Sequence, residues 1–157
     1  MKAVFAAALA FAFLGTGCVA IDGGAVEVSW TIFAADGRGV INDCSCAEPG
    51  IASVQLKLAG PPGSESQVDP CQGTDACRFS CGRKTGSTPF IIPQGAYLMS
   101  IEPLTADGTL AAGAMVPDPI VSQVEKGVPD DLMAFEIQAP CALRCHGDDL
   151  TRACAAD

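Results

Sequence analysis

Residues 25–33, with the sequence AVEVSWTIF, alternate between apolar and polar side chains. Successive side chains of a β-strand point to opposite faces, so this alternation predicts a strand with one buried face. The predicted buried face carries Val26, Val28, Trp30 and Ile32. We therefore expect the folded part of the chain to begin with a β-strand that lies against a hydrophobic core.

Short apolar or alternating stretches of the same kind recur along the chain, with Gly, Pro and Asp between them. We expect further strands at residues 52–58, 77–81, 88–92, 96–104, 109–116, 120–124 and 132–138. Seven or eight short strands with little helical periodicity predict an all-β fold, specifically an antiparallel Greek-key β-sandwich of about seven strands. A small β-barrel is the alternative.

The first 17 residues have the pattern of a signal peptide. Lys2 supplies a positive charge, residues 3–14 carry no charge, and small residues precede Cys18. A charged start, a short apolar run and small residues before a cleavage site are typical of exported chains. The run is shorter than the about 20 residues that a spanning helix needs. A buried N-terminal helix is the alternative, although the run has no polar face.

Small residues followed by Cys18 resemble the lipobox of bacterial lipoproteins, although Leu14 lies one position further from the cysteine than in the family pattern. The resemblance implies that Cys18 becomes the first residue and carries fatty acyl chains such as palmitate. More than one chain makes membrane attachment stable. Val19 and Ala20, in place of an Asp after the cysteine, favour the outer membrane. The alternative is an ordinary secretory signal, with Cys18 in a disulfide.

The chain has nine cysteines, so lipidation of Cys18 would leave an even number. An even set in an exported chain predicts a disulfide framework. The eight candidates are Cys44, Cys46, Cys71, Cys77, Cys81, Cys141, Cys145 and Cys154. The sequence does not fix their pairing. Cys44 and Cys46 are two positions apart and share a face, so we expect them to bond to different partners.

Two further segments carry a second resemblance. Residues 93–99, PQGAYLM, and residues 124–127, VEKG, are similar to a turn and a later hairpin of the prealbumin-like, carboxypeptidase-regulatory-like β-sandwiches. The resemblance covers residues 50–138. It implies a sandwich that serves as an accessory or adhesive module and carries no catalytic residue. The cysteine content is a departure, because those modules generally lack disulfides.

The charge balance excludes some partners. Eighteen acidic residues against nine Lys and Arg give a net charge of −9. Nucleic-acid binding depends on Lys and Arg, so we expect no nucleic-acid partner, and an acidic surface also disfavours electrostatic docking on anionic lipid. No loop has the regular Asp spacing of a dedicated calcium site.

The C-terminal tail holds the only histidine, His146, directly after Cys145. The segment from Cys141 to His146 is one residue longer than the haem-attachment pattern Cys-x-x-Cys-His. A haem or zinc carrier that uses this cluster is one alternative, but an exported chain favours disulfides, so we expect no cofactor and no metal. The acid pairs at 130–131 and 148–149 are interpreted as solvated loop charge rather than a glycosidase pair.

Two aromatic residues are candidate binding platforms. Trp30 lies on the apolar face of its strand, so we expect it in the core. Tyr97 is expected to be a corner tyrosine whose hydroxyl bonds to the backbone, as in other Greek-key sandwiches.

Four parts are expected along the chain: a signal peptide (1–17), a lipidated N-terminus and tether (18–24), one β-sandwich domain (25–140) and a cysteine-rich tail (141–157) that forms a short cap. The sequence predicts a non-enzymatic lipoprotein of the bacterial cell envelope, anchored to the membrane by lipid. Its loops, chiefly residues 60–75, would meet an envelope protein or an extracellular ligand. A small envelope enzyme with an unrecognised site is the other alternative.

Overall fold

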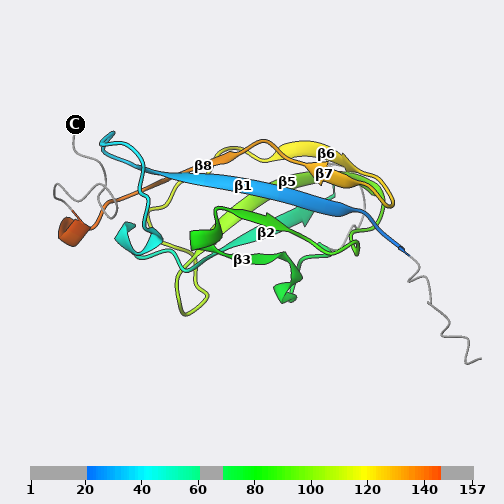
Figure 1. The fold of residues 1–157 in the computed structure, drawn as a ribbon, viewed down its shortest axis with the longest axis horizontal. Helices are drawn as coiled ribbons and strands as arrows, with labels where there is room; N and C mark the ends of the chain where they lie inside the picture. Colours follow the sequence, from blue (N-terminus) through cyan, green and yellow to red (C-terminus); the bar gives the residue numbers. More distant parts are fainter. Residues whose placement is uncertain (1–20, 61–68, 146–157) are drawn as a thin grey trace, which may run out of the picture.

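The computed structural model describes residues 21–60 and 69–145, and Figure 1 shows their arrangement. Cys18 and the expected leader lie outside these ranges, as does the middle of the loop predicted at 60–75. His146, the acid pair at 148–149 and Cys154 also lie outside them.

The described residues form an all-β structure with two four-stranded sheets and four short 3-10 helices. The strands are β1 (Ala25–Ala34), β2 (Ser53–Ala59), β3 (Arg78–Ser80), β4 (Thr85–Ser87), β5 (Gly95–Leu104), β6 (Ile120–Val124), β7 (Pro129–Asp131) and β8 (Phe135–Ala139). The 3-10 helices are η1 (Cys44–Cys46), η2 (Asp75–Cys77), η3 (Cys81–Arg83) and η4 (Leu143–Cys145).

One sheet has the strand order β3-β2-β5-β6 and is antiparallel throughout. Its longest pairing joins β2 to β5, from Ser53 opposite Leu104 to Ala59 opposite Leu98. Each of these strands was predicted from its alternation to within one or two residues. The alternating pattern places Val54, Leu56 and Leu58 inside, where all three are fully buried.

The other sheet is built around β1, which is paired along both edges. β4 lies antiparallel on one edge, whereas β7 and β8 lie parallel on the other. The prediction of a purely antiparallel fold is therefore wrong for this sheet. Alternation of side chains reports which face of a strand is buried, but it carries no information on the direction of its partner.

β7 and β8 act as one interrupted strand along β1. Ala25 lies opposite Pro129, but Trp30 lies opposite Phe135, so the partner strand contains one extra residue between the two pairings. Such an extra residue is a bulge, which bends a strand locally. Leu132 sits at the interruption, where its N–H donates to the Glu27 carbonyl at 3.0 Å and its side chain is buried.

Two of the predicted strands, at residues 88–92 and 109–116, are absent from the described structure. Residues 109–116 make only single bridges, Leu104 to Leu110 and Met115 to Gln138. Residues 88–92 form a turn that bridges back to Gly24 through Ile92. β4 is not among the strands expected from the sequence, because its polar and Gly residues show no apolar alternation.

The inward faces of both sheets contribute to one hydrophobic core. The predicted face of β1 is buried, and Trp30 is 2% exposed. The indole N–H of Trp30 donates to the Cys81 carbonyl at 3.2 Å, and its ring stacks against Phe79 of the other sheet with centroids 6.3 Å apart. A large aromatic pair thus joins the two sheets, as expected for a Trp in the core.

Tyr97 is a corner tyrosine, as predicted. Its side chain is buried and its hydroxyl donates to the Pro93 carbonyl at 2.8 Å. Burial raises the pKa of this phenol above its ordinary value of 10.0. The hydroxyl therefore holds the turn before β5 in place rather than offering a platform to a ligand.

Substitution of Gly86 by alanine tests the packing between the sheets. A Cβ at Gly86 would overlap the ring of Phe79, which is itself buried against Trp30. Because overpacking displaces both groups, we expect a loss of about 1–3 kcal/mol in the free energy of unfolding, measured with urea. Gly82→Ala is the control, since a Cβ there meets no atom within 4 Å. Equal effects of the two substitutions would contradict this packing.

Substitution of Tyr97 by phenylalanine should give a pH-dependent effect. Below pH 10.0 the variant should lose about 1 kcal/mol of unfolding free energy with the hydrogen bond to Pro93. Because the folded pKa is raised, this contribution is lost as the pH rises through the folded value. Urea unfolding of both proteins between neutral pH and pH 11 should therefore show the difference shrinking only at the alkaline end. A constant difference would refute the assignment.

Candidate functional site

Three disulfides join described cysteines: Cys44–Cys81, Cys46–Cys145 and Cys71–Cys77. Cys44 and Cys46 thus bond to different partners, as their spacing predicted. Cys141 is also disulfide-bonded. The bonds at η1 tie the loop before β2 to η3 and to η4, so the described part of the tail forms a short cross-linked cap.

The same end of the molecule holds further contacts of the cap. Ala47 bridges to Cys141, the Ala142 N–H donates to the Cys46 carbonyl at 2.8 Å, and Arg144 donates to the Ser45 carbonyl at 2.6 Å. Cys141 and Cys145, the two cysteines of the segment that approaches the haem-attachment pattern, are in disulfides. They are therefore not available as thioethers or thiolate ligands in this structure.

A cleft of about 340 Å³ lies on the outer face of β2, β3 and β5. One wall is the disulfide loop from Cys71 to Cys77, which ends the segment predicted to be the binding loop. The lining residues are Gln55, Lys57, Cys71, Gln72, Gly73, Thr74, Asp75, Arg78, Glu102, Leu104, Gly108 and Leu110. No aromatic side chain is among them, so the cleft lacks the usual stacking surface for a sugar.

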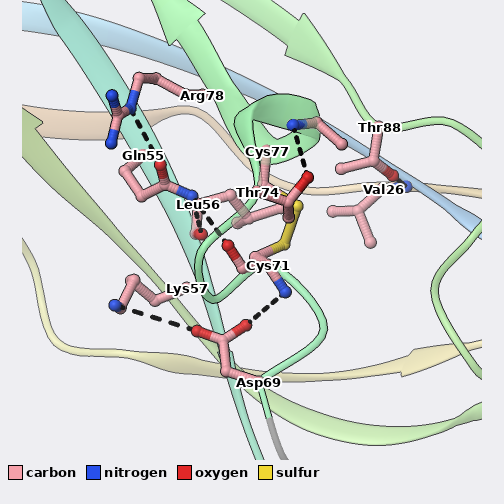
Figure 2. Close-up of a disulfide and its surroundings, with 11 residues drawn as sticks. Val26, Gln55, Leu56, Lys57, Asp69, Cys71, Thr74, Cys77, Arg78 and Thr88 are labelled. Carbon is pink, nitrogen blue, oxygen red and sulfur yellow. Dashed lines mark hydrogen bonds and ion pairs between the residues drawn. A yellow bond between two sulfur atoms is a disulfide. The ribbon is translucent and has the colours of Figure 1, made fainter.

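Gln55 connects the sheet to the disulfide loop (Figure 2). Its side chain is only 7% exposed, although it faces outward from β2. Its amide nitrogen donates to the carbonyls of Leu56 at 3.2 Å and Cys71 at 3.5 Å, and its amide oxygen accepts from Arg78 Nε at 3.3 Å. Through these hydrogen bonds the buried amide holds the disulfide loop against β2 and β3.

Ion pairs and backbone hydrogen bonds hold the rest of the loop. Lys57 Nζ lies 4.0 Å from Asp69, and Asp69 also accepts from the Cys71 N–H at 2.8 Å (Figure 2). Lys57 Nζ also lies 3.7 Å from Glu102. Thr74 caps η2 by accepting from the Ala76 N–H at 3.1 Å. These contacts join the wall of the cleft to β2 and β5.

Charges of both signs surround a small apolar area in the cleft. Arg78 lies 3.7 Å from Asp75, so each cation of the cleft has a carboxylate near it. Leu104 is buried on the outer face, whereas Leu110 is 61% exposed at the rim. The lining of the cleft is thus mostly polar and charged, with its exposed apolar side chain, Leu110, at the rim.

The hairpin that carries Leu110 is also ordered by its own side chains. The Asp107 carboxylate accepts from the Thr109 N–H at 3.2 Å and from the hydroxyls of Thr105 and Thr109. The hydrogen bonds from Thr105 and Thr109 lower the pKa of Asp107 below its ordinary value. Asp107 and Gly108 form the turn of this hairpin, with Gly108 at φ +81°.

Outside the cleft, Lys84 contacts a disulfide. Its ammonium lies 3.5 Å from Cys44 Sγ of the Cys44–Cys81 disulfide. Burial lowers the pKa of this ammonium, and the Asp43 carboxylate acts in the opposite direction. The contact packs the cation over the bond that joins η1 to η3.

Asp130 and Asp131 lie in β7 rather than in a loop, so that part of the sequence interpretation is wrong. Asp130 accepts from the Ser122 hydroxyl at 2.6 Å. Successive residues of a strand point to opposite faces, so the two carboxylates do not converge on one bond of a substrate.

Among residues 21–60 and 69–145, no cluster of three or more His, Cys, Asp or Glu side chains is arranged to hold a metal ion. The helices of this same part of the chain are all too short or too polar to span a bilayer. Comparison with known protein families, curated proteins and solved structures finds no match to this chain.

The sequence predicts a binding loop at residues 60–75, but it does not predict the cleft beside the Cys71–Cys77 part of that segment. The alternating pattern indicates only that Gln55 and Arg78 point outward from their strands. The signal that could have found them is their register, since β2 places Gln55 opposite both Arg78 and Glu102. Register is set by tertiary pairing, which alternation alone does not reveal.

Removal of the Cys71–Cys77 bond should loosen the cleft without unfolding the protein. The bond closes a short loop of sequence separation 6, whereas Cys46–Cys145 spans 99 positions. In the chain-entropy description these bonds stabilise by about 2.2 and about 4.7 kcal/mol. Hydrogen exchange of Cys71→Ser/Cys77→Ser should accelerate mainly in residues 71–77, whereas Cys46→Ser/Cys145→Ser should lower global stability more. Faster exchange throughout the first variant would contradict this.

Proposed function

We propose that this chain is a non-enzymatic lipoprotein of the bacterial envelope, held at the outer membrane by acyl chains on Cys18. Its two sheets would form a Greek-key-like β-sandwich that acts as an accessory binding module. The observation that carries the binding role is the cleft walled by the Cys71–Cys77 loop, since the disulfide and the Gln55 side chain hold that wall against the sheet.

Cysteine parity supports the anchor. Seven cysteines of the described residues are in disulfides, three pairs among themselves plus Cys141. Cys18 and Cys154 complete the nine of the chain. One of these two is therefore left outside the disulfides if the other pairs with Cys141, and acylation at the lipobox would account for Cys18 as that sulfur.

The cleft supports a protein partner over a small substrate. Its lining mixes paired charges with the apolar side chains of Leu104 and Leu110, and the Gln55 amide is already committed to the loop and to Arg78. A surface of this kind is complementary to another folded surface with a polar rim. We propose that an envelope protein docks here, with Leu110 at the contact.

Intact mass spectrometry tests the anchor. The full chain, expressed in a Gram-negative host and purified from membranes, should begin at Cys18, carry the mass of its acyl chains and show the mass deficit of four disulfides. Cys18→Ser should abolish acylation and leave the protein uncleaved or soluble. An unacylated protein that begins at another residue would refute the lipoprotein assignment.

Photo-crosslinking in the producing bacterium tests the cleft. A photoreactive phenylalanine analogue at Leu110 should give one discrete protein adduct, and Arg78→Glu should reduce that adduct by about tenfold because it reverses a charge in the cleft. The analogue at Val121, which is 66% exposed on β6 of the same sheet, is the matched control. Equal labelling at both positions, or an adduct insensitive to Arg78→Glu, would exclude a partner at the cleft.

A further inference from the structure

The described chain begins at one end of the long axis of the molecule, and η4 lies at the other end (Figure 1). β1 runs between them for ten residues, about 33 Å at the rise of a strand. The cleft is displaced towards the η4 end, because Glu102 and Leu104 stand at the far end of β5 from Gly95. The two ends of the molecule therefore have different surroundings.

Backbone hydrogen bonds hold Gly23 and Gly24 directly against two turns of the folded domain. Gly24 exchanges two backbone hydrogen bonds with Ile92, at 2.8 and 3.1 Å, and the Gly23 carbonyl accepts from Gly127 at 3.0 Å. A Cβ at Gly23 would lie 2.6 Å from the Ile92 oxygen, and one at Gly24 would overlap Glu125. Only glycines allow this segment to lie between the turns at 89–92 and 125–128.

The same two turns expose apolar side chains beside the chain start. Ile91 and Val128 are each 48% exposed, and Phe90 and Ile21 are also exposed. Single exposed apolar residues need no explanation, but here four come from three adjoining segments. The charges beside them are partly neutralised, since Lys126 lies 3.8 Å from Asp22.

Covalent geometry limits how far this end can stand from an anchor at Cys18. Gly23 is five positions after Cys18, so a fully extended tether spans at most about 17 Å. We propose that Phe90, Ile91 and Val128 form a membrane-contact surface that rests in the headgroup region of the bilayer to which Cys18 is attached. This inference rests on the proposed lipid anchor.

Such a contact would fix the orientation of the protein relative to the bilayer. Apolar side chains at the boundary between headgroups and acyl chains gain from burial in the way that interfacial helices do. The short tether keeps these three residues at the interface, and the cleft is then held on the side of the molecule away from the bilayer, towards a partner. Because the net charge of −9 disfavours contact with anionic lipid, we expect these residues to rest on zwitterionic lipid.

Fluorescence quenching by brominated phosphatidylcholine tests the contact. Lipidated Phe90→Trp, Ile91→Trp and Leu143→Trp proteins would be reconstituted in vesicles with brominated or ordinary lipid. Leu143 is the matched control because it is 80% exposed but lies in η4 at the opposite end. Trp30 is buried and gives the same background in all three proteins.

We expect bromine to quench Phe90→Trp and Ile91→Trp about twofold more than Leu143→Trp, as for side chains held in the interface. Two variants at the contact keep the test valid if one of them fails to fold. If the proteins stay on the vesicles but all three are quenched equally, the contact surface is wrong while the anchor stands. If the parent protein carries no acyl chain and washes off the vesicles, both the anchor and the contact surface are refuted.

Discussion

The constraint on which the structure depends is the position of β1. This strand has one apolar, buried face and is paired along both edges. Its inward side chains fill the core and its backbone accepts β4 on one side and the interrupted β7–β8 strand on the other. Because Trp30 also stacks on Phe79 of the second sheet, β1 joins the two sheets as well as organising its own. A change in β1 would therefore affect both sheets at once.

The direction of β1 also determines where two of the disulfides lie. β1 leads into the loop that contains η1, and two bonds from η1 hold η3 and η4 at the same end of the molecule. The third bond has a different role, since Cys71–Cys77 closes only a local loop and shapes the cleft wall. Two disulfides thus hold this end of the molecule together, the third shapes the wall of the proposed binding cleft, and Cys18 is the proposed anchor.

The sequence predicted those features that depend on local pattern. The buried face of β1, the strands at β2, β5 and β6, and the hydrogen-bonded Tyr97 all follow from alternation or from a short motif. β4 could not be predicted, because Thr85, Gly86 and Ser87 form a strand only by pairing with β1. The segment 109–116 has enough apolar residues for a strand but meets its neighbours only at isolated bridges. The parallel direction of β8 and the contacts of Gln55 are likewise products of tertiary pairing.

Disulfide mapping tests the central arrangement most directly. Digestion of the unreduced protein, with peptide mass spectrometry, should yield linked peptides that contain Cys44 with Cys81, Cys46 with Cys145 and Cys71 with Cys77. These pairs require the ends of β1 and β8 and the start of β2 to meet as described. A protein in which Cys44 or Cys46 is linked to Cys71 or Cys77 would contradict the topology around β1 and the cleft built on it.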